Sequence, residues 1–496
     1  MLSSLPEAIT ILFSLEGLLV LVLGTVLGIV LGAMPGIGST VAVAIVLPFT
    51  LTMGQAPAVL LLLAVYAGSV YGGSIAAILI NTPGTPQSAA TCLDGYPMAQ
   101  RGDAGLALGW ATVASVVGGL VSAVVLIFAA PQLAAFALQF GPIETFALVL
   151  LGMTCIVSVS TGSVVKGLTA GMIGIFLSTV GGDPILGEMR FTFGNWQLFA
   201  GFNLLAVVIG VFALSEVLMR ASAPIRTVSE LVQFNGVKLP SRAMWKGRYR
   251  NLGKSVLIGN VIGVLPGTGA ATAAFISYAE GRRSSPNKDN FGKGEPDGIV
   301  SSEAANNAVT GGALVPTMAL GIPGDAITAV MLATLTLHGI TPGPKLVEDN
   351  PTLIAAIFAG FFLINILLLP LGLLLSRVAA PILRMREAFM MTAIVILCAV
   401  GIYFVRGNPF DLLVLGGAGV FGFILRRQGF PMAPLVIGMV LGPTLELTLR
   451  QGLILTDGSF QAFFTGSPIA LVLTLTAIVA LAFPFFRGII STKPRV

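Results

Sequence analysis

Charged residues are scarce in this chain, and their scarcity limits the kind of protein it can be. Asp, Glu, Lys and Arg make up 9% of the 496 residues, whereas a soluble domain carries roughly a quarter. Hydrophobic residues make up 55%, and apolar runs of about 20 residues recur from end to end. A soluble domain is therefore excluded. An outer-membrane barrel would show weak alternating segments instead, so the sequence predicts an all-α polytopic membrane protein.

Residues for metal-centre and hydrolytic chemistry are almost missing. His338 is the single histidine, and Cys92, Cys155 and Cys398 are scattered, which makes neither a disulfide framework nor a metal site. The sequence has no Gly-x-x-x-x-Gly-Lys-Ser/Thr motif for ATP phosphates. We therefore expect no enzyme and no cofactor. The segment Met1–Thr10 has no Lys or Arg and lacks the charged start of a cleavable signal peptide.

Basic residues gather in one polar linker, residues 221–254. Its only acid is Glu230, and its basic residues together with Arg220, which precedes it, are Arg220, Arg226, Lys238, Arg242, Lys246, Arg248, Arg250 and Lys254. A short basic loop between membrane segments is held on the cytoplasmic side. This placement explains the net charge of +5 without a nucleic-acid partner, and we expect none.

Glycine and proline are abundant, and they interrupt apolar runs at defined places. In the first half the run Glu16–Ala33 ends in Pro35–Thr40, and the run Pro57–Ile80 ends in Asn81–Gln87. Pro removes a hydrogen-bond donor and Gly loosens the backbone, so a helix breaks at each place. Irregular backbone in a bilayer persists only where it is buried in protein or lines a wet cavity. A single break would be interpreted as a kink.

The same pattern returns after the linker. Gly259–Gly269 repeats Gly28–Gly38, including Pro266-Gly267-Thr268-Gly269, and Gly321–Asp325 answers Asn81–Thr85. Further equivalences follow in the same order at an offset of about 230–250 residues. We therefore expect two homologous membrane repeats, 1–220 and 255–496, joined by the linker 221–254. The uncharged N-terminus favours the outside, whereas the basic linker favours the inside. The two repeats are therefore expected to be inverted, with about 12 transmembrane segments in total. The side of the C-terminus stays open.

Two polar stretches are expected as loops. Asp94–Asp103 follows the first broken element, and Glu280–Gly298 is an insertion that exists only in the second half. The insertion is balanced in charge, which is typical of a solvated loop. Remaining apolar stretches predict spans at Val41–Leu51, Gly105–Ala130, Thr145–Val159, Val164–Val180 and Leu198–Met219.

Matched interrupted segments in two halves indicate a transporter site at the repeat interface. Amides at a helix start attract a carboxylate, and free carbonyls with Ser, Thr and Asn oxygens suit a small hard cation. The predicted substrate-binding residues are Asn81, Thr82, Gly84, Thr85, Gln87, Pro323 and Gly324. The predicted cation-binding residues are Gly36, Gly38, Ser39, Thr40, Gly267, Thr268, Gly269, Glu303, Asn306, Asn307 and Asp325.

Two carboxylates in apolar context carry most weight among the cation candidates. Buried membrane carboxylates are costly and are functional by default. Glu303, Asn306 and Asn307 stand at i, i+3 and i+4 and share one face of a helix, although a polar helix–helix seam is the alternative. Asp325 closes the second broken tip, whose counterpart Thr85 is neutral.

These motifs resemble the large membrane subunit of tripartite tricarboxylate transporters, the TctA family. The resemblance covers nearly the whole chain. It is carried by Pro35-Gly36-Ile37-Gly38, Tyr71–Ser74 through Asn81–Pro86, Asp94–Pro97, Pro266–Gly269 and Ser302–Asn307.

The resemblance implies a permease of the bacterial inner membrane. It implies a small membrane subunit of about four helices, a periplasmic substrate-binding protein, and uptake of small carboxylates such as citrate driven by Na⁺ rather than ATP. It also implies an elevator-like architecture with re-entrant hairpins. A homodimer, the exact carboxylate and Na⁺ versus H⁺ stay open. A stand-alone carboxylate permease and an ion channel are the rival interpretations.

Overall fold

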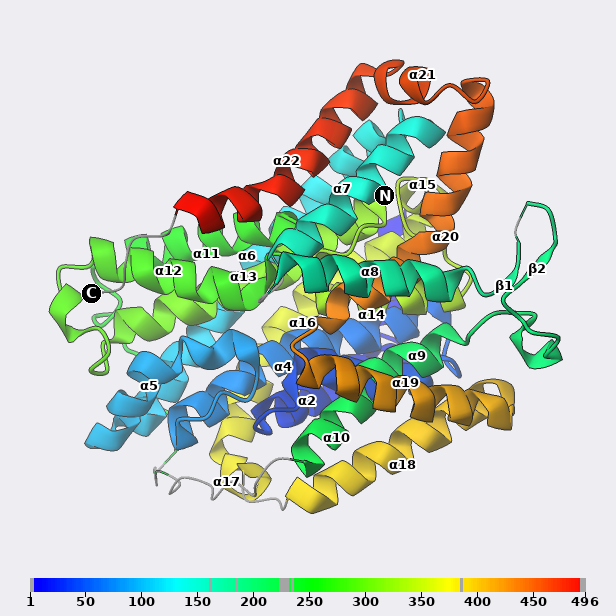
Figure 1. Cartoon of the computed structure of the whole chain (residues 1–496). Helices are drawn as coiled ribbons and strands as arrows, with labels where there is room; N and C mark the ends of the chain where they lie inside the picture. Colours follow the sequence, from blue (N-terminus) through cyan, green and yellow to red (C-terminus); the bar gives the residue numbers. More distant parts are fainter. Residues whose placement is uncertain are drawn as a thin grey trace.

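A computed structural model describes residues 4–159, 163–183, 185–222, 232, 236–383 and 387–490. These residues form an α-helical assembly with one small β-hairpin (Figure 1). The helices are α1 (Leu5–Leu12), α2 (Leu15–Ala33), α3 (Gly38–Thr50), α4 (Gln55–Ile80), α5 (Cys92–Met98), α6 (Ala104–Ala137), α7 (Pro142–Val159), α8 (Val164–Ser178), α9 (Leu204–Ile209), α10 (Ser215–Ala221), α11 (Tyr249–Val264), α12 (Gly269–Ser284), α13 (Pro296–Leu320), α14 (Ala326–Leu337), α15 (Leu346–Asp349), α16 (Pro351–Arg377), α17 (Ala379–Leu383), α18 (Glu387–Arg406), α19 (Pro409–Arg427), α20 (Met432–Leu455), α21 (Phe460–Thr465) and α22 (Pro468–Ile490).

The hairpin and several tight turns complete the list of elements. Strands β1 (Gly181–Gly182) and β2 (Met189–Arg190) pair antiparallel. Short 3₁₀ or π-helical turns are η2 (Pro86–Ala89), η3 (Ala99–Asp103), η4 (Trp196–Leu198), η5 (Gly210–Leu214) and η6 (Lys288–Asn290).

Seven helices are long and apolar enough to cross a membrane within the described residues: α2, α4, the stretch Cys92–Ala137, the stretch Leu204–Ala221, α16, α19 and α20. Shorter apolar helices accompany them, including α3, α8 and α14. The chain is therefore a multi-pass membrane protein, as the hydropathy predicts. The apolar window of α4 is completely buried, which shows that this helix lies inside the protein and not against lipid.

Two sets of helices pack mainly among themselves. In the first, α2 lies along α4, α11 and α12 lie along α13, α6 lies along α13, and α16 contacts both α4 and α6. In the second, α7 and α8 pack against α20, α7 packs against α22, and α19 packs against the stretch from α9 to α10. Figure 1 shows α9 beside α19 in the lower part of the molecule, with α8 above them. Each broken element begins at the end of a helix of the first set, namely α2, α4, α11 or α13.

Glycines bring the two helices of each half together at matching places. A Cβ atom on Gly28 of α2 would lie 2.5 Å from the Val65 carbonyl oxygen and 3.0 Å from the Gly68 Cα atom of α4. A Cβ atom on Gly259 of α11 would lie 2.3 Å from the Ala305 carbonyl oxygen of α13, close to Ala308. Both pairs need a small residue at the crossing. These matched contacts support the repeat proposed below.

The prediction of a loop at Asp94–Asp103 is wrong. Residues 92–98 form α5, and a π-helical turn, η3, leads directly into α6. Gly102, with φ of 93°, absorbs the change of direction. The polar sequence predicted a loop. The prediction failed because Asp94, which makes this stretch polar, is buried against a distant part of the chain.

The basic linker is partly packed, and its residues Arg226 and Glu230 lie outside the described part. Trp245 packs edge-on against Trp110 of α6, with ring centroids 4.7 Å apart. Arg248 lies over the Trp110 ring and pairs with Glu295 at 2.9 Å. The second end of the linker is therefore fixed to the helices of the first set.

An ion network fixes the β-hairpin to α20. Arg190 pairs with Glu446 at 2.6 Å, and Arg450 pairs with Asp183 at 2.9 Å. Backbone amides of Leu186 and Ile185, together with Arg450, hold the pKa of Asp183 at about 2, below its usual 3.8. The Asp183 carboxylate thus connects the β-hairpin to Arg450 of α20.

Asp183→Asn is expected to lower the melting temperature in a pH-dependent way. Because the folded pKa lies below the unfolded one, the carboxylate stabilises the fold above about pH 4, and this stabilisation is lost as the pH falls through about 2. The melting-temperature gap between the wild type and the variant should be constant from pH 5 to 8 and shrink below pH 4. Asp349→Asn, at the exposed end of α15, is the control and should show no such pH-dependent gap.

Candidate transport site

The first break and the first tip touch each other. Helix α2 ends at Ala33, and Gly36 takes a left-handed φ of 81° before α3 begins. The Gly36 N–H donates to the Gly84 carbonyl at 3.3 Å. Gly84 has no room for a side chain, because a Cβ atom would lie 2.0 Å from the Gly32 carbonyl oxygen. The predicted cation-binding residues of the first break and the predicted substrate-binding residues of the first tip therefore lie in contact.

The second break and the second tip make the same contact. Gly267, with φ of 85°, donates its N–H to the Gly324 carbonyl at 2.7 Å. Gly324 packs against Ala313 of α13, where a Cβ atom would lie 2.6 Å from the Ala313 Cα atom. Thr268, in the second break, donates its hydroxyl to the Ile262 and Leu265 carbonyls of α11.

Both tips begin with a left-handed residue and end with a capping box. Asn81 (φ 51°) ends α4 and Gly321 (φ 71°) ends α13. After the tips, Thr85 pairs with Ser88 at the start of η2, and Asp325 pairs with Thr328 at the start of α14. The capping residues satisfy amides that a broken helix leaves free. The tips are thus ordered turns whose conformation follows from their Gly, Asn and hydroxyl residues.

The Asp325 carboxylate caps α14 and links the two halves. One oxygen accepts the Ile327 and Thr328 amides at 3.0 and 2.8 Å, and the other accepts the Tyr66 hydroxyl of α4 at 2.7 Å. The residue is 8% exposed. Its capping role was readable from the Asp-x-x-Thr spacing, whereas the Tyr66 partner was not. Its role as a cation ligand stays a prediction.

Glu303 lies fully buried between the halves. Its two carboxylate oxygens accept hydroxyls of Thr91 and of Ser115 on α6, the latter at 3.0 Å. Thr91 also lies 3.0 Å from the Ser302 hydroxyl. The neighbours of Glu303 in this network are neutral hydroxyls, and no ion pair to it occurs within the described residues. Such a carboxylate in low-dielectric surroundings favours a bound cation or a proton.

Four of the predicted site residues carry buried polar atoms that have no hydrogen-bond partner. They are the Ser39 hydroxyl, the Gln87 amide oxygen, the Asn307 amide oxygen, and both side-chain atoms of Asn306. Asn306, Asn307 and Ser39 are at most 1% exposed. Buried polar atoms are nearly always paired, so the unpaired atoms on these four residues are available to a ligand.

The two tips do not hydrogen-bond to each other in the described residues. Instead, η2 packs against α12 and α13, and α14 packs against α3 and α4. Each tip is therefore seated on helices of the opposite half. Among the predicted residues, Asn81 is exposed, Thr82, Thr40 and Gly38 are partly buried, and Thr85, Pro323 and Gly324 are buried.

Eight further residues in the described part of the chain carry a buried polar atom without a hydrogen-bond partner and were not predicted, and three of them are Asn260, Asn365 and Ser277. The Asn260 and Asn365 amide oxygens and the Ser277 hydroxyl have no hydrogen-bond partner. Asn365 of α16 faces Gly119 of α6, where a Cβ atom would lie 1.8 Å from the Asn365 oxygen. A lone Asn in each of two otherwise apolar runs was the signal that would have found Asn260 and Asn365.

Asp94 holds the second half's insertion against the first half. One of its oxygens accepts the amides of Gly292, Gly294 and Glu295 at 2.7–2.9 Å, and the other accepts the Tyr278 hydroxyl at 2.8 Å. Phe291, within the insertion, is 6% exposed. The prediction that this insertion is simply solvated is therefore wrong for Phe291, Gly294 and Glu295, which are buried.

Asp94→Asn is expected to lower the melting temperature and to loosen α5. Removing charged acceptors from three amides costs roughly 1.5–3 kcal/mol. Maleimide labelling of Cys92, two residues away, should become several-fold faster in a chain whose other cysteines are replaced by Ser. Asp349→Asn is the control. Labelling as slow as in the wild type would show that the hydrogen bonds accepted by Asp94 do not hold α5 in place.

No group of three His, Cys, Asp or Glu side chains suited to a transition metal occurs among the described residues. Backbone carbonyls at the breaks, hydroxyls and amide oxygens are the groups present, and these are ligands for hard cations. The remaining intramembrane charges are occupied otherwise. The Glu144 carboxylate accepts the Gly141 amide, and Lys166 donates to the Gln428 carbonyl.

Comparison with known proteins identifies the family. The model of the tripartite tricarboxylate transporter TctA family matches residues 18–437. This chain belongs to the TctA family. A protein of Agrobacterium vitis, described as an uncharacterized 52.8 kDa protein in the TAR-I ttuC' 3'region, is 37% identical over 479 residues, covering 95% of this chain and 94% of that protein.

A second Agrobacterium vitis protein supports the same assignment. It is described as an uncharacterized protein in the TAR-II ttuC' 3'region and is 36% identical over 238 residues, covering 48% of this chain and 98% of that protein. No solved structure matches. The chain is thus a component of a tricarboxylate transporter, and membership of a tripartite system implies partner subunits and a substrate.

Proposed function

We propose that this TctA protein is the permease subunit of a binding-protein-dependent tripartite transporter that takes up di- or tricarboxylates together with Na⁺ in the bacterial inner membrane. The observation that carries the proposal is the set of unpaired buried polar atoms on Ser39, Gln87, Asn306 and Asn307. They lie in or beside the elements formed by the breaks and tips.

The division of roles follows from chemistry. The amides that start α3 offer partial positive charge to a carboxylate, and the first tip, with the predicted substrate residues Asn81, Thr82, Gly84, Thr85 and Gln87, hydrogen-bonds to the break before that helix. Oxygen atoms of Glu303, Asn306, Asn307 and the breaks at Gly36–Thr40 and Gly267–Gly269 suit a small cation. The Arg220 guanidinium lies against Gly36 at the first break, and a co-transported cation offsets the remaining negative charge of a di- or tricarboxylate.

The same proposal includes the architecture. Two inverted repeats, 1–220 and 255–496, with about 12 transmembrane segments, carry one broken helix and one hairpin each. The matched contacts Gly36–Gly84 and Gly267–Gly324 support this symmetry. Alternating access then moves the helices around the hairpins against the second helix set in an elevator-like manner.

Reconstitution in vesicles tests the function. The chain, with its small membrane subunit and binding protein, should take up labelled citrate only under an inward Na⁺ gradient. A K⁺ gradient of the same size is the control. Uptake without the binding protein would favour a stand-alone permease, and a current without saturable uptake would favour a channel. Uptake indifferent to both Na⁺ and the binding protein would overturn the proposal.

Asp325→Asn and Glu303→Gln are expected to lower Na⁺-driven uptake by at least about tenfold, the effect of losing roughly 1.4 kcal/mol of binding. Both variants keep the shape of the side chain, so they should still insert in the membrane. Comparison with Glu348→Gln, an exposed carboxylate on α15, controls for charge. Wild-type uptake in both variants would show that the cation assignments are wrong.

A further inference from the structure

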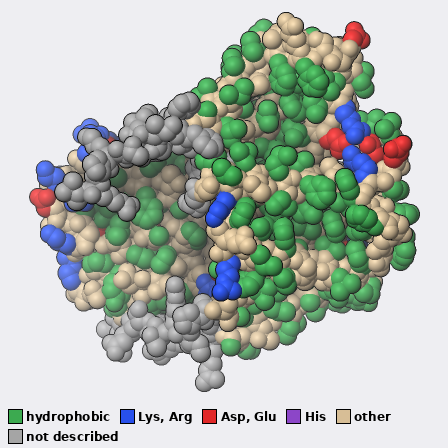
Figure 2. All heavy atoms as spheres, viewed as in Figure 1, with side chains coloured by type: hydrophobic (Ala, Val, Ile, Leu, Met, Phe, Trp, Pro, Cys, Tyr) green, Lys and Arg blue, Asp and Glu red, His purple; other side chains and the backbone are tan. Residues whose placement is uncertain are grey.

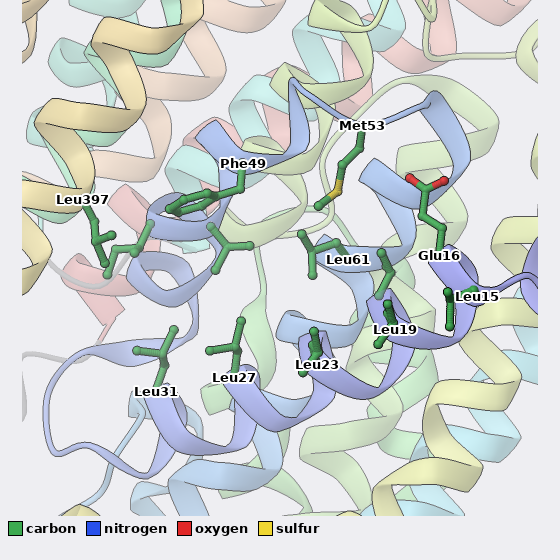
Figure 3. Close-up of a pocket in the computed structure, with 13 residues that line it drawn as sticks. Leu15, Glu16, Leu19, Leu23, Leu27, Leu31, Phe49, Met53, Leu61 and Leu397 are labelled. Atoms are coloured by element: carbon green, nitrogen blue, oxygen red, sulfur yellow. The ribbon is translucent and has the colours of Figure 1, made fainter.

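A long apolar groove runs along α2 on the outside of the first helix set. Leu19, Leu23 and Leu27 form one wall, spaced four residues apart on one face of the helix, and Phe49 of α3 and Leu397 of α18 close the other side (Figure 3). The groove has a volume of about 650 Å³. These leucines are 43–52% exposed, so the wall remains accessible from outside the protein.

The dimensions of the groove select an acyl chain rather than a helix. From Leu15 to Leu31 the groove extends about 24 Å, at about 1.5 Å per residue. A helix of that length and about 10 Å in diameter occupies roughly 1,900 Å³ and would not lie wholly within the groove, whereas a single acyl chain is much thinner. The hydrocarbon of one leaflet is about 15 Å thick, so a chain of that leaflet would reach from Glu16 to about Leu27.

A carboxylate stands at one end of this apolar groove. Glu16 lines it beside Leu15 and Leu19 (Figure 3). The side chain is exposed, and no ion pair to it occurs within the described residues. It lies at the end of α2 opposite to Gly36, where Arg220 of α10 packs. A cationic headgroup at this end would complement the carboxylate.

We propose that this groove is a binding site for a phospholipid with a primary ammonium headgroup, whose acyl chain lies along Leu19–Leu27 while its ammonium pairs with Glu16. The bound lipid fills the space between α2 and α3 on one side and Leu397 of α18 on the other. This site does not depend on which solute the transporter carries.

Photolabelling of the full chain tests the proposal. The chain is placed in vesicles of phosphatidylethanolamine and phosphatidylglycerol that contain either lipid with a diazirine in its acyl chain, and labelled peptides are mapped by mass spectrometry. We expect the ethanolamine lipid to label peptides of α2, α3 and α18 at least threefold more than the glycerol lipid. Glu16→Gln should remove this preference.

Filling the groove provides the second arm. Leu23→Trp combined with Leu27→Trp should reduce labelling of α2 and α3 at least fivefold, whereas Leu374→Trp, on an exposed face of α16, should not. Should the double variant fail to run as a single species in gel filtration, Leu27→Phe replaces it. Equal labelling by both lipids, labelling unchanged by Glu16→Gln, or labelling unchanged by filling the groove would overturn the proposal. So would the absence of the lipid label from α2, which is the result expected if a second copy or a partner's helix covers the groove.

Discussion

Asn306→Leu is expected to abolish Na⁺-coupled carboxylate uptake while the melting temperature stays the same or rises. Asn306 is fully buried, and neither atom of its amide group has a hydrogen-bond partner. An unsatisfied buried amide costs about 1–3 kcal/mol, so an apolar side chain of similar size relieves the apo protein. If the amide binds a transported ligand, losing roughly 1.5–3 kcal/mol of binding reduces uptake about 10- to 150-fold.

Asn203→Leu is the matched control for this result. Asn203 is also buried, but its amide donates to Asp411 at 2.7 Å and accepts the Leu205 amide at the start of α9. Its replacement should lower the melting temperature and leave uptake per folded molecule close to that of the wild type. Thermal unfolding and vesicle uptake of the two variants therefore separate a ligand site from a polar helix seam. A stability loss in Asn306→Leu equal to that of Asn203→Leu would favour the seam.

Gly84→Ala is expected to disrupt the first tip. The added methyl group would lie 2.0 Å from the Gly32 carbonyl oxygen and 2.9 Å from the Gly73 Cα atom. Both contacts are with backbone, which cannot rotate away as a side chain can. The variant should lose roughly 1–3 kcal/mol of stability or more, and uptake should fall with it because Gly36 hydrogen-bonds to the Gly84 carbonyl.

Gly253→Ala is the control, because it adds the same methyl group at a glycine that has free space around it. Gly253 lies inside α11, and its added Cβ atom would meet no atom within 4 Å. Alanine is the better helix former by about 1 kcal/mol, so this variant should be as stable as the wild type or more so. The melting temperature and the monodisperse yield of both variants check the prediction. A Gly84→Ala protein as stable as Gly253→Ala would contradict the packing of the tip.

The ends of the helices could be predicted largely from the sequence because each has a local cause. Pro35 and the glycines around it end α2 close to the predicted place, and the predicted runs Glu16–Ala33 and Pro57–Ile80 become α2 and α4, which start one and two residues earlier. Pro and Gly act on the backbone within one turn, so a single sequence contains the whole signal.

The partners of the buried charges could not be predicted, because they depend on contacts between distant parts of the chain. Asp325 was assigned from its place in an apolar tip, but its oxygens accept Tyr66, far away in sequence, as well as its own helix amides. Asp94 made its stretch resemble a loop, although residues 292–295 bury it. Nothing local records which hydroxyl or amide a carboxylate will meet.

Measuring both solutes in the same vesicles tests the central claim most directly. Labelled citrate and ²²Na⁺ uptake are recorded in parallel into vesicles that contain the complete assembly, with Asn306→Leu as the comparison. Coupled transport predicts that each solute enters only when the other is present, in a fixed ratio, and that Asn306→Leu loses both fluxes together. Citrate uptake at the full rate without Na⁺ entry, under a Na⁺ gradient or without one, would contradict the account.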